Sequence, residues 1–177
     1  MAEREANLLE NLVITRIFDA PRELVWKAWT DPKYVMQWWG PKGFTSPSCE
    51  IDLRVGGRYL FCMRAPDGQE FWSGGEYTEI IAPEKIVAVL FYADKNGRVE
   101  PKDVSHFIEG HRPADSNEVE VRDVVTFEEI GSGQTKLTFK RSHWDEGEDT
   151  GSNQIFDKLA VFVAKLAKAN HRDLPTT

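Results

Sequence analysis

The residues best able to do chemistry lie in a predicted hairpin near the end of the chain. Residues 119–129 and 134–143 alternate so that Asp123 shares a face with apolar side chains of the first strand, and Arg141 and His143 share one with those of the second. Alternate residues of a strand share a face, so all three side chains are predicted to point inward. A carboxylate that faces a core is costly unless it is paired or hydrated. Asp123 is therefore predicted to pair with Arg141 or His143, depending on loop register, or to reach a solvated cavity with them.

Three roles are open for these residues: a structural ion pair, recognition of a polar group on a ligand, and catalysis. His143, at the end of its strand, is the best general-base candidate if the protein catalyses a reaction. The sequence contains no Gly-x-Ser-x-Gly, no Ser/His/Asp signature and no phosphate-binding glycine loop. We therefore assign no catalytic residue, and expect binding rather than enzymatic activity.

Metal and cofactor signatures are weak. His106 and His111 lie five residues apart in an irregular segment, away from the cysteines and close carboxylates that would complete a metal site. Cys49 and Cys62 lack Cys-x-x-Cys spacing and lie in strand-like segments, where buried reduced thiols are expected. No metal and no cofactor is predicted.

The elements that must position these residues begin with a strand over residues 14–18, followed by Pro21 at the first position of a helix that Asp19 or Ala20 would cap. A second short helix is expected from Pro32 to the Trp38-Trp39-Gly40-Pro41 corner. Strands are predicted over 49–55, 58–64, 71–81 and 85–92. The pair Gly56-Gly57 predicts positive φ angles in a tight hairpin, and Gly74-Gly75 predicts a bulge or bend.

The last part of the chain combines a long loop with a long helix. Residues 93–118 have no periodicity and are expected to form either a lid, with Phe107 turned inward, or a floppy insertion. Residues 152–169 form an amphipathic helix, whose apolar stripe contains Ile155, Phe156, Leu159, Phe162, Val163 and Leu166.

Length and charge limit the class of protein. The 177 residues are predicted to form one domain, 1–177, with its core at about 12–168 and flexible ends at 1–10 and 171–177. A net charge of −7 argues against nucleic acid or an anionic membrane as the main partner. No apolar run approaches the roughly 20 residues of a membrane span, and the acidic N-terminus does not resemble a signal peptide. We expect a cytoplasmic protein, monomeric or homodimeric.

Several segments occur in an order that resembles one family closely. They are FDAPRELVWKAWTDP (Phe18 to Pro32), WWGPKGF (Trp38 to Phe44), DLRVGGRY (Asp52 to Tyr59), APDG (Ala65 to Gly68), GEY (Gly75 to Tyr77), PEKIV (Pro83 to Val87), VTFEE (Val125 to Glu129), TKLTF (Thr135 to Phe139) and FDKLA (Phe156 to Ala160). Together they resemble proteins similar to the activator of heat-shock protein 90 ATPase, within the START-like (SRPBCC) superfamily.

The resemblance implies an α+β helix-grip (START-like, Bet v-like) fold. In that fold a curved antiparallel sheet wraps around a long C-terminal helix, two short helices follow the first strand, and an apolar cavity lies between sheet and helix. It also implies that Trp38 and Trp39 mark the cavity rim.

Aromatic side chains are numerous, with 6 Trp, 10 Phe and 4 Tyr, and could line such a cavity or simply fill the core. The predicted ligand-binding residues are Trp38, Trp39, Phe44, Phe61, Trp72, Tyr77, Phe91, Phe107, Asp123, Arg141, His143 and Phe156. The expected function is binding of a small, mainly hydrophobic or aromatic ligand. The alternatives are a cyclase- or hydrolase-type enzyme that uses the same cavity, and a co-chaperone-like regulator of the heat-shock protein 90 ATPase.

Overall fold

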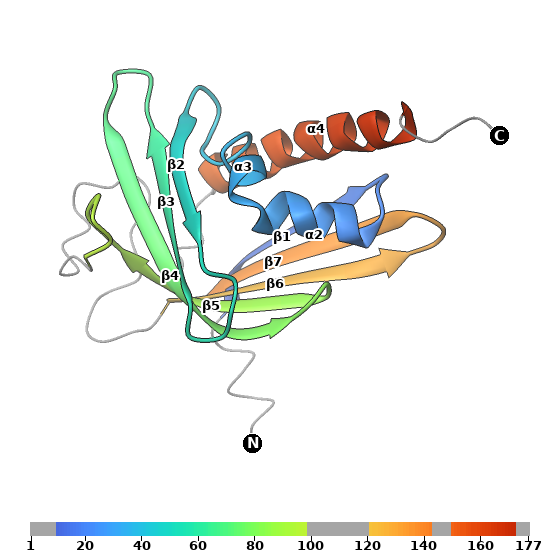
Figure 1. Ribbon diagram of the computed structural model, residues 1–177, viewed down its shortest axis with the longest axis horizontal. Helices are drawn as coiled ribbons and strands as arrows, with labels where there is room; N and C mark the ends of the chain where they lie inside the picture. The colour runs from blue at the N-terminus through green and yellow to red at the C-terminus, as the bar shows by residue number, and fades with distance from the viewer. Residues whose placement is uncertain (1–9, 99–120, 143–149, 173–177) are drawn as a thin grey trace.

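The computed structural model describes residues 10–98, 121–142 and 150–172 (Figure 1). Within these ranges the elements are, in order, β1 (Glu10–Phe18), α2 (Arg22–Thr30), α3 (Pro32–Val35), β2 (Thr45–Ile51), β3 (Arg58–Arg64), β4 (Glu70–Ile81), β5 (Lys85–Tyr92), β6 (Val121–Ile130), β7 (Gln134–Ser142) and α4 (Thr150–Arg172). Most of the predicted 93–118 loop, including Phe107, lies outside the described residues, and so does His143.

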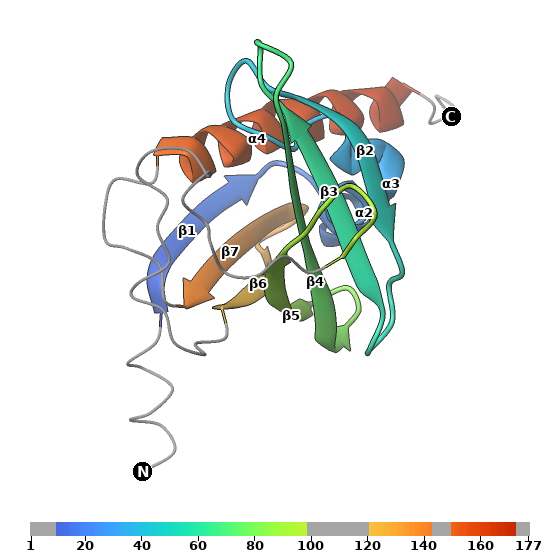
Figure 2. The same cartoon turned by 90° about the vertical axis from the view of Figure 1, so that its left-hand side faces the viewer.

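All seven strands form one antiparallel sheet in the order β1-β7-β6-β5-β4-β3-β2. The first strand therefore pairs with the last one, and every other strand pairs with its neighbour in sequence. Figures 1 and 2 show that the sheet is strongly curled and that α4 crosses its open, concave side. The predicted helix-grip fold is confirmed.

The first turn after β1 differs from the prediction. Pro21 is the N-cap of α2, with ψ at 151°, rather than its first helical residue, and no side chain caps this helix. The carbonyl of Pro21 accepts from the backbone N–H groups of Leu24 and Val25. Asp19, predicted as a cap, instead accepts a hydrogen bond from Gln134 on β7.

The second helix is also shorter than predicted, since α3 ends at Val35 and a turn carries the chain to Trp38.

The two glycine pairs have different structural roles. Gly56 has the predicted positive φ of 79°, whereas Gly57 does not have a positive φ and is needed because a Cβ there would lie 2.2 Å from the Asp52 carbonyl oxygen. Gly74 and Gly75 sit in regular register with β3, and the irregularity of β4 falls later, between Tyr77 and Glu79. The predicted bulge at Gly74-Gly75 was therefore wrong.

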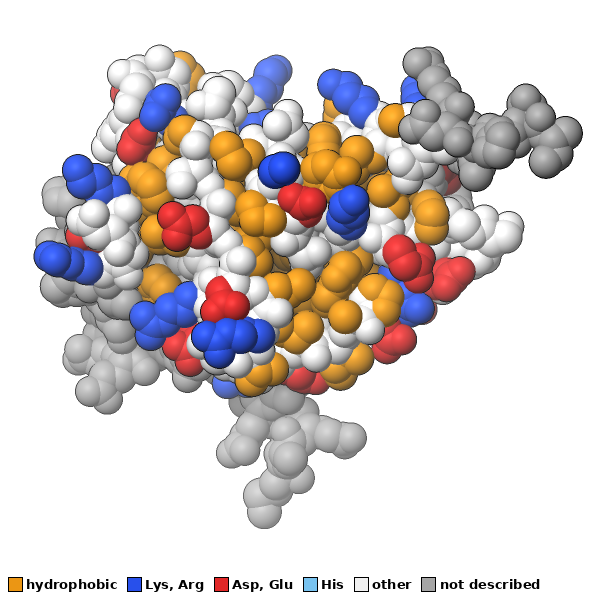
Figure 3. Space-filling view, in the orientation of Figure 1, with side chains coloured by type: hydrophobic (Ala, Val, Ile, Leu, Met, Phe, Trp, Pro, Cys, Tyr) orange, Lys and Arg blue, Asp and Glu red, His pale blue; other side chains and the backbone are white. Residues whose placement is uncertain are grey.

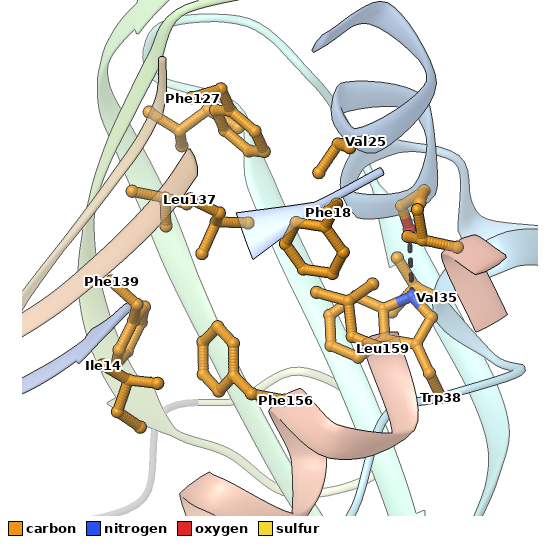
Figure 4. Close-up of a cluster of buried hydrophobic side chains, with 14 of the residues drawn as sticks. Ile14, Phe18, Val25, Val35, Trp38, Phe127, Leu137, Phe139, Phe156 and Leu159 are labelled. Atoms are coloured by element: carbon orange, nitrogen blue, oxygen red, sulfur yellow. Dashed lines mark hydrogen bonds between the residues drawn. The ribbon is translucent and has the colours of Figure 1, made fainter. Parts of the chain in front are cut away.

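The core lies between the concave face of the sheet and the helices (Figure 4). Buried side chains from β1, β6 and β7 meet Phe156 and Leu159 of α4 and Val25 of α2. Trp38 is 1% exposed, and its indole N–H donates to the carbonyl of Ala28 over 3.0 Å. Burial of each such side chain stabilises the fold by roughly 1.5–3 kcal/mol.

Candidate ligand-binding site on the concave face

A buried ion pair lies at the centre of the candidate site. Register places Asp123 of β6 directly opposite Arg141 of β7. The guanidinium donates from Nε and Nη2 to the two carboxylate oxygens, each over 2.7 Å. The side chains of Arg141 and Asp123 are only 12% and 10% exposed. Because both carboxylate oxygens accept from Arg141, we assign Asp123 no role as a general base.

The pair continues a row of side chains across the concave face. In successive strands the register joins Tyr77 to Ala88, Ala88 to Asp123, and Arg141 to Leu12. Opposing residues of an antiparallel sheet share a face, so Tyr77 and the ion pair point to the same side, with the small Ala88 between them. The inward direction predicted for Asp123 and Arg141 therefore agrees with the observed register.

An unbroken series of ring contacts joins the two sides of this face. The Arg141 guanidinium lies 5.2 Å from the centroid of the Phe139 ring. From Phe139 the series runs through Phe156 (5.4 Å), Trp29 (5.8 Å), Trp38 (5.1 Å), Trp39 (5.7 Å), Phe61 (4.9 Å), Tyr59 (4.6 Å) and Tyr77 (5.4 Å), each distance measured to the preceding ring centroid. The series thus starts at Arg141 and ends at Tyr77, in the same row of the sheet.

The predicted site residues divide into those inside this series and those elsewhere. Trp38, Trp39, Phe61, Tyr77, Asp123, Arg141 and Phe156 belong to it. Phe44 lies immediately before β2 and contacts Phe71, at 6.2 Å between ring centroids. Phe107 and His143 fall outside the described residues.

Trp72 and Phe91 lie on the opposite face of the sheet from Asp123. Trp72 is paired with Cys62, which follows the inward-facing Phe61 on β3. Successive residues of a strand point to opposite faces, so Cys62 and Trp72 point away from the concave face. A Cβ on Gly74 would lie 2.6 Å from the ring of Phe91, whereas a Cβ on Gly75, on the other face, would meet Tyr59. The structure therefore does not bring Trp72 and Phe91 together with the other predicted residues.

The sequence did not identify Tyr59 and Trp29 as candidate site residues. The strand that carries Tyr59 has apolar side chains on both faces, so its inward face was ambiguous from alternation alone. The usable signal was Gly75: a glycine in mid-strand indicates a close approach by another group. Here that group is the ring of Tyr59. Trp29 was assigned to packing, and it contacts Trp38, Phe139 and Phe156.

The tyrosines report on the electrostatics of the concave face. Burial raises the pKa of Tyr59 well above its usual value; the charge of Asp123 raises it further and that of Arg141 opposes this. Burial also raises the pKa of Tyr77, with smaller contributions from Cys49 and Asp52. Both phenols are therefore neutral hydrogen-bonding groups in a region that disfavours negative charge.

A lysine of α4 fixes the loop that follows Trp39. The Nζ of Lys158 donates to the carbonyl oxygens of Gly40 (2.9 Å) and Phe44 (3.0 Å), and lies 3.5 Å from that of Pro41. Gln154, one turn earlier, accepts from the backbone N–H of Lys42 over 3.0 Å. Burial lowers the pKa of Lys158. These contacts hold the Trp39 corner against α4.

Other kinds of site find little support in the described ranges. Among these residues no three His, Cys, Asp or Glu side chains are grouped as metal ligands. None of the helices described is long and apolar enough to cross a membrane. On the face shown in Figure 3, charged side chains of both signs are interspersed with hydrophobic ones rather than gathered in a basic patch.

The curled seven-stranded sheet, the long C-terminal helix and the two helices after β1 define a member of the START-like (SRPBCC) superfamily. Within it, residues 19–164 match the family model described as "Activator of Hsp90 ATPase homolog 1-like protein". The chain belongs to this family.

Solved structures from several bacteria share the fold. A protein of Nitrosomonas europaea is 22% identical with a TM-score of 0.67, over 91% of this chain and 97% of that one. A protein of Arthrobacter aurescens is 21% identical with a TM-score of 0.68, over 90% and 88%. The AHSA1 protein of Silicibacter pomeroyi is 20% identical with a TM-score of 0.64, over 88% and 98%. At these identities the likeness shows the fold alone. No curated protein sequence matches the chain.

Proposed function

We propose that this protein binds a small, mainly hydrophobic or aromatic ligand between the concave face of the sheet and α4. The observation that carries the proposal is a buried, bidentate Asp123–Arg141 pair on a face otherwise lined by aromatic and aliphatic side chains. Small-molecule sites are typically apolar surfaces with a few placed polar groups. A buried ion pair is weak evidence for stability alone, which makes a recognition role worth testing.

Ala88 gives a direct test because it lies between Tyr77 and Asp123 and is 2% exposed. The Ala88→Leu variant adds bulk to the concave face, whereas Val89→Leu adds it to the opposite face. The probe is a neutral naphthalene ketone, dimethylaminonaphthalene with a propionyl group, whose fluorescence rises in apolar surroundings. We expect saturable binding to the unmodified protein and to Val89→Leu, and at least a tenfold weaker affinity in Ala88→Leu.

Circular dichroism of both variants checks that each has folded. Saturable binding that Ala88→Leu leaves unchanged would place the probe elsewhere and contradict the proposal. So would an absence of binding by the probe and by a panel of lipids and aromatic metabolites in native mass spectrometry.

A second candidate, regulation of the heat-shock protein 90 ATPase, is favoured by the description of the family to which the chain belongs. An ATPase assay of that chaperone with and without this protein, paired with a pull-down, separates the two. Absence of both stimulation and association would remove this candidate and leave the first intact. The two free cysteines fit a reducing compartment, and we propose a cytoplasmic location.

A further inference from the structure

Tyr59 reaches across the concave face toward the ion pair. Its Cα on β3 is opposite Gly75 of β4, and a Cβ on that glycine would lie 2.5–2.6 Å from the Cε1, Cζ and hydroxyl oxygen of Tyr59. The hydroxyl end therefore lies over β4, on the side of β5 and β6. The charges of Asp123 and Arg141 both act on this phenol. Gly75 thus provides the space through which the hydroxyl approaches the pair.

The hydroxyl of Tyr59 has no hydrogen-bond partner among the described residues. The residue as a whole is 8% exposed, and its ring contacts within the described ranges are those with Phe61 and Tyr77. Polar groups in a protein interior are nearly always hydrogen-bonded. A phenol in this position is consequently available to a bound molecule.

The surroundings select against a charged partner. Asp123 and Arg141 neutralise each other through two hydrogen bonds. Burial and the carboxylate of Asp123 both disfavour a negative charge at the Tyr59 oxygen, and a ligand carboxylate beside it would meet the same penalty. A ligand ammonium would have to be desolvated next to the Arg141 guanidinium. The favoured ligand group is uncharged, and a neutral phenol donates best to a carbonyl or ether oxygen.

We propose that the Tyr59 hydroxyl donates a hydrogen bond to an accepting oxygen of an uncharged, mainly hydrophobic ligand, such as a ketone, ester or quinone. This inference rests on the proposed ligand-binding function and adds its specificity. Asp123 and Arg141 act as positioning residues that keep the region beside this hydroxyl electrically neutral.

Tyr77 is a matched control within the same face. It is 6% exposed and its ring lies 5.4 Å from that of Tyr59. The groups that act on its phenol are, however, Cys49 and Asp52 of the β2 side, rather than the ion pair. Removing either hydroxyl as Tyr→Phe keeps the ring and its packing, so the two variants differ only in which hydroxyl is lost.

The experiment measures the affinity of three dimethylaminonaphthalene probes that carry a propionyl, a propyl or a carboxylate group at the same ring position. We expect the unmodified protein to bind the propionyl probe about tenfold more tightly than the propyl probe, which corresponds to one hydrogen bond, and the carboxylate most weakly. In Tyr59→Phe the ratio of propionyl to propyl affinities falls to about one. Tyr77 lines the same face, so Tyr77→Phe changes the affinities of both probes by the same factor and keeps their ratio. The bound ketone's carbonyl stretching frequency should rise in Tyr59→Phe alone.

The outcomes separate this inference from the function on which it rests. If the propionyl and propyl probes bind equally well and Ala88→Leu abolishes the binding of both, the proposed ligand site stands but the role of Tyr59 is overturned. A loss of discrimination in Tyr77→Phe instead of Tyr59→Phe, or preference for the carboxylate, would overturn it too. Failure of all three probes to bind would overturn the role of Tyr59, and failure of the panel of lipids and aromatic metabolites as well would contradict both proposals.

Discussion

At the scale of single residues, the buried Asp123–Arg141 pair is the most unusual feature of the core. Two charges are removed from water at a large cost, which their mutual attraction and two 2.7 Å hydrogen bonds offset only while both partners are present. Removing one partner leaves a buried charge, whereas removing both leaves an apolar surface. This asymmetry makes the contribution of the pair measurable.

We therefore expect Asp123→Val and Arg141→Met each to lower the free energy of unfolding by about 3–5 kcal/mol, and the double variant to lose clearly less than the sum. Urea unfolding of the four proteins gives the coupling energy. Glu128→Gln is the control, because Glu128 and Lys136 form an exposed pair at 3.7 Å across the same two strands and should lose less than about 1 kcal/mol. Single variants no less stable than this control would show that the buried pair is energetically unimportant.

Residue-level inference from the sequence worked where one face of a strand was clearly polar. Asp123 alternates with valines and a phenylalanine, so its inward direction followed from period two. The choice of Arg141 over His143 as partner needed the register, which the three-residue turn between Ile130 and Gln134 sets. Trp72 comes from a strand whose two faces both mix polar and apolar residues, and Phe91 comes from a strand that is apolar on both faces. Alternation therefore did not show which way either side chain points.

At the scale of elements, the contact of Lys158 with the α3–β2 loop joins two parts that are distant in sequence. Its ammonium donates to carbonyl groups that no strand or helix satisfies, and burial lowers its pKa. Charged hydrogen bonds of this kind contribute more than neutral ones. The loop also carries Trp39, so the same contact orients one part of the aromatic series.

Replacing this lysine should loosen the loop without dissolving the helix. We expect Lys158→Met to lower the free energy of unfolding by about 1–2 kcal/mol, because the methionine keeps the aliphatic stem but leaves the carbonyls to water. Hydrogen exchange should quicken at residues 40–45 more than in the sheet. Lys165→Met, on an exposed position of α4, is the control. Equal exchange in the two variants would contradict the assigned role.

The sequence predicted the existence and type of the elements better than their ends. The predicted second helix reached Trp38-Trp39, but α3 stops at Val35, where the Trp38 indole turns back to bond the Ala28 carbonyl. α4 extends beyond its predicted range at both ends. The Trp38 bond is a tertiary contact, which local propensity does not contain, and helix ends are in general the least defined part of an element.

At the scale of the whole molecule, the folded structure raises the pKa values of four weak acids carried by β2, β3 and β4. Burial raises the pKa of Cys49 from 9.0 to about 12, helped by Asp31 and Glu50, and that of Cys62 from 9.0 to about 11, helped by Glu70. The pKa values of Tyr59 and Tyr77 are raised as well. All four groups remain protonated in the folded protein at pH values where they ionise in the unfolded chain.

This predicts a loss of stability in alkali. Below about pH 9 the four groups are protonated in both the folded and the unfolded state, so they give no pH dependence. Above this pH the unfolded chain binds fewer protons than the folded protein. The free energy of unfolding then falls by up to about 1.4 kcal/mol per pH unit for each group that is ionised in the unfolded chain but not in the folded protein. Urea unfolding between about pH 7 and pH 11 should show a plateau followed by this decline. In a Cys49→Ala, Cys62→Ala double variant the plateau is lower, because two packed side chains are lost, but the alkaline slope is shallower and begins nearer the tyrosine range. A slope identical in the two proteins would show that the thiols ionise as readily in the folded chain as in the unfolded one.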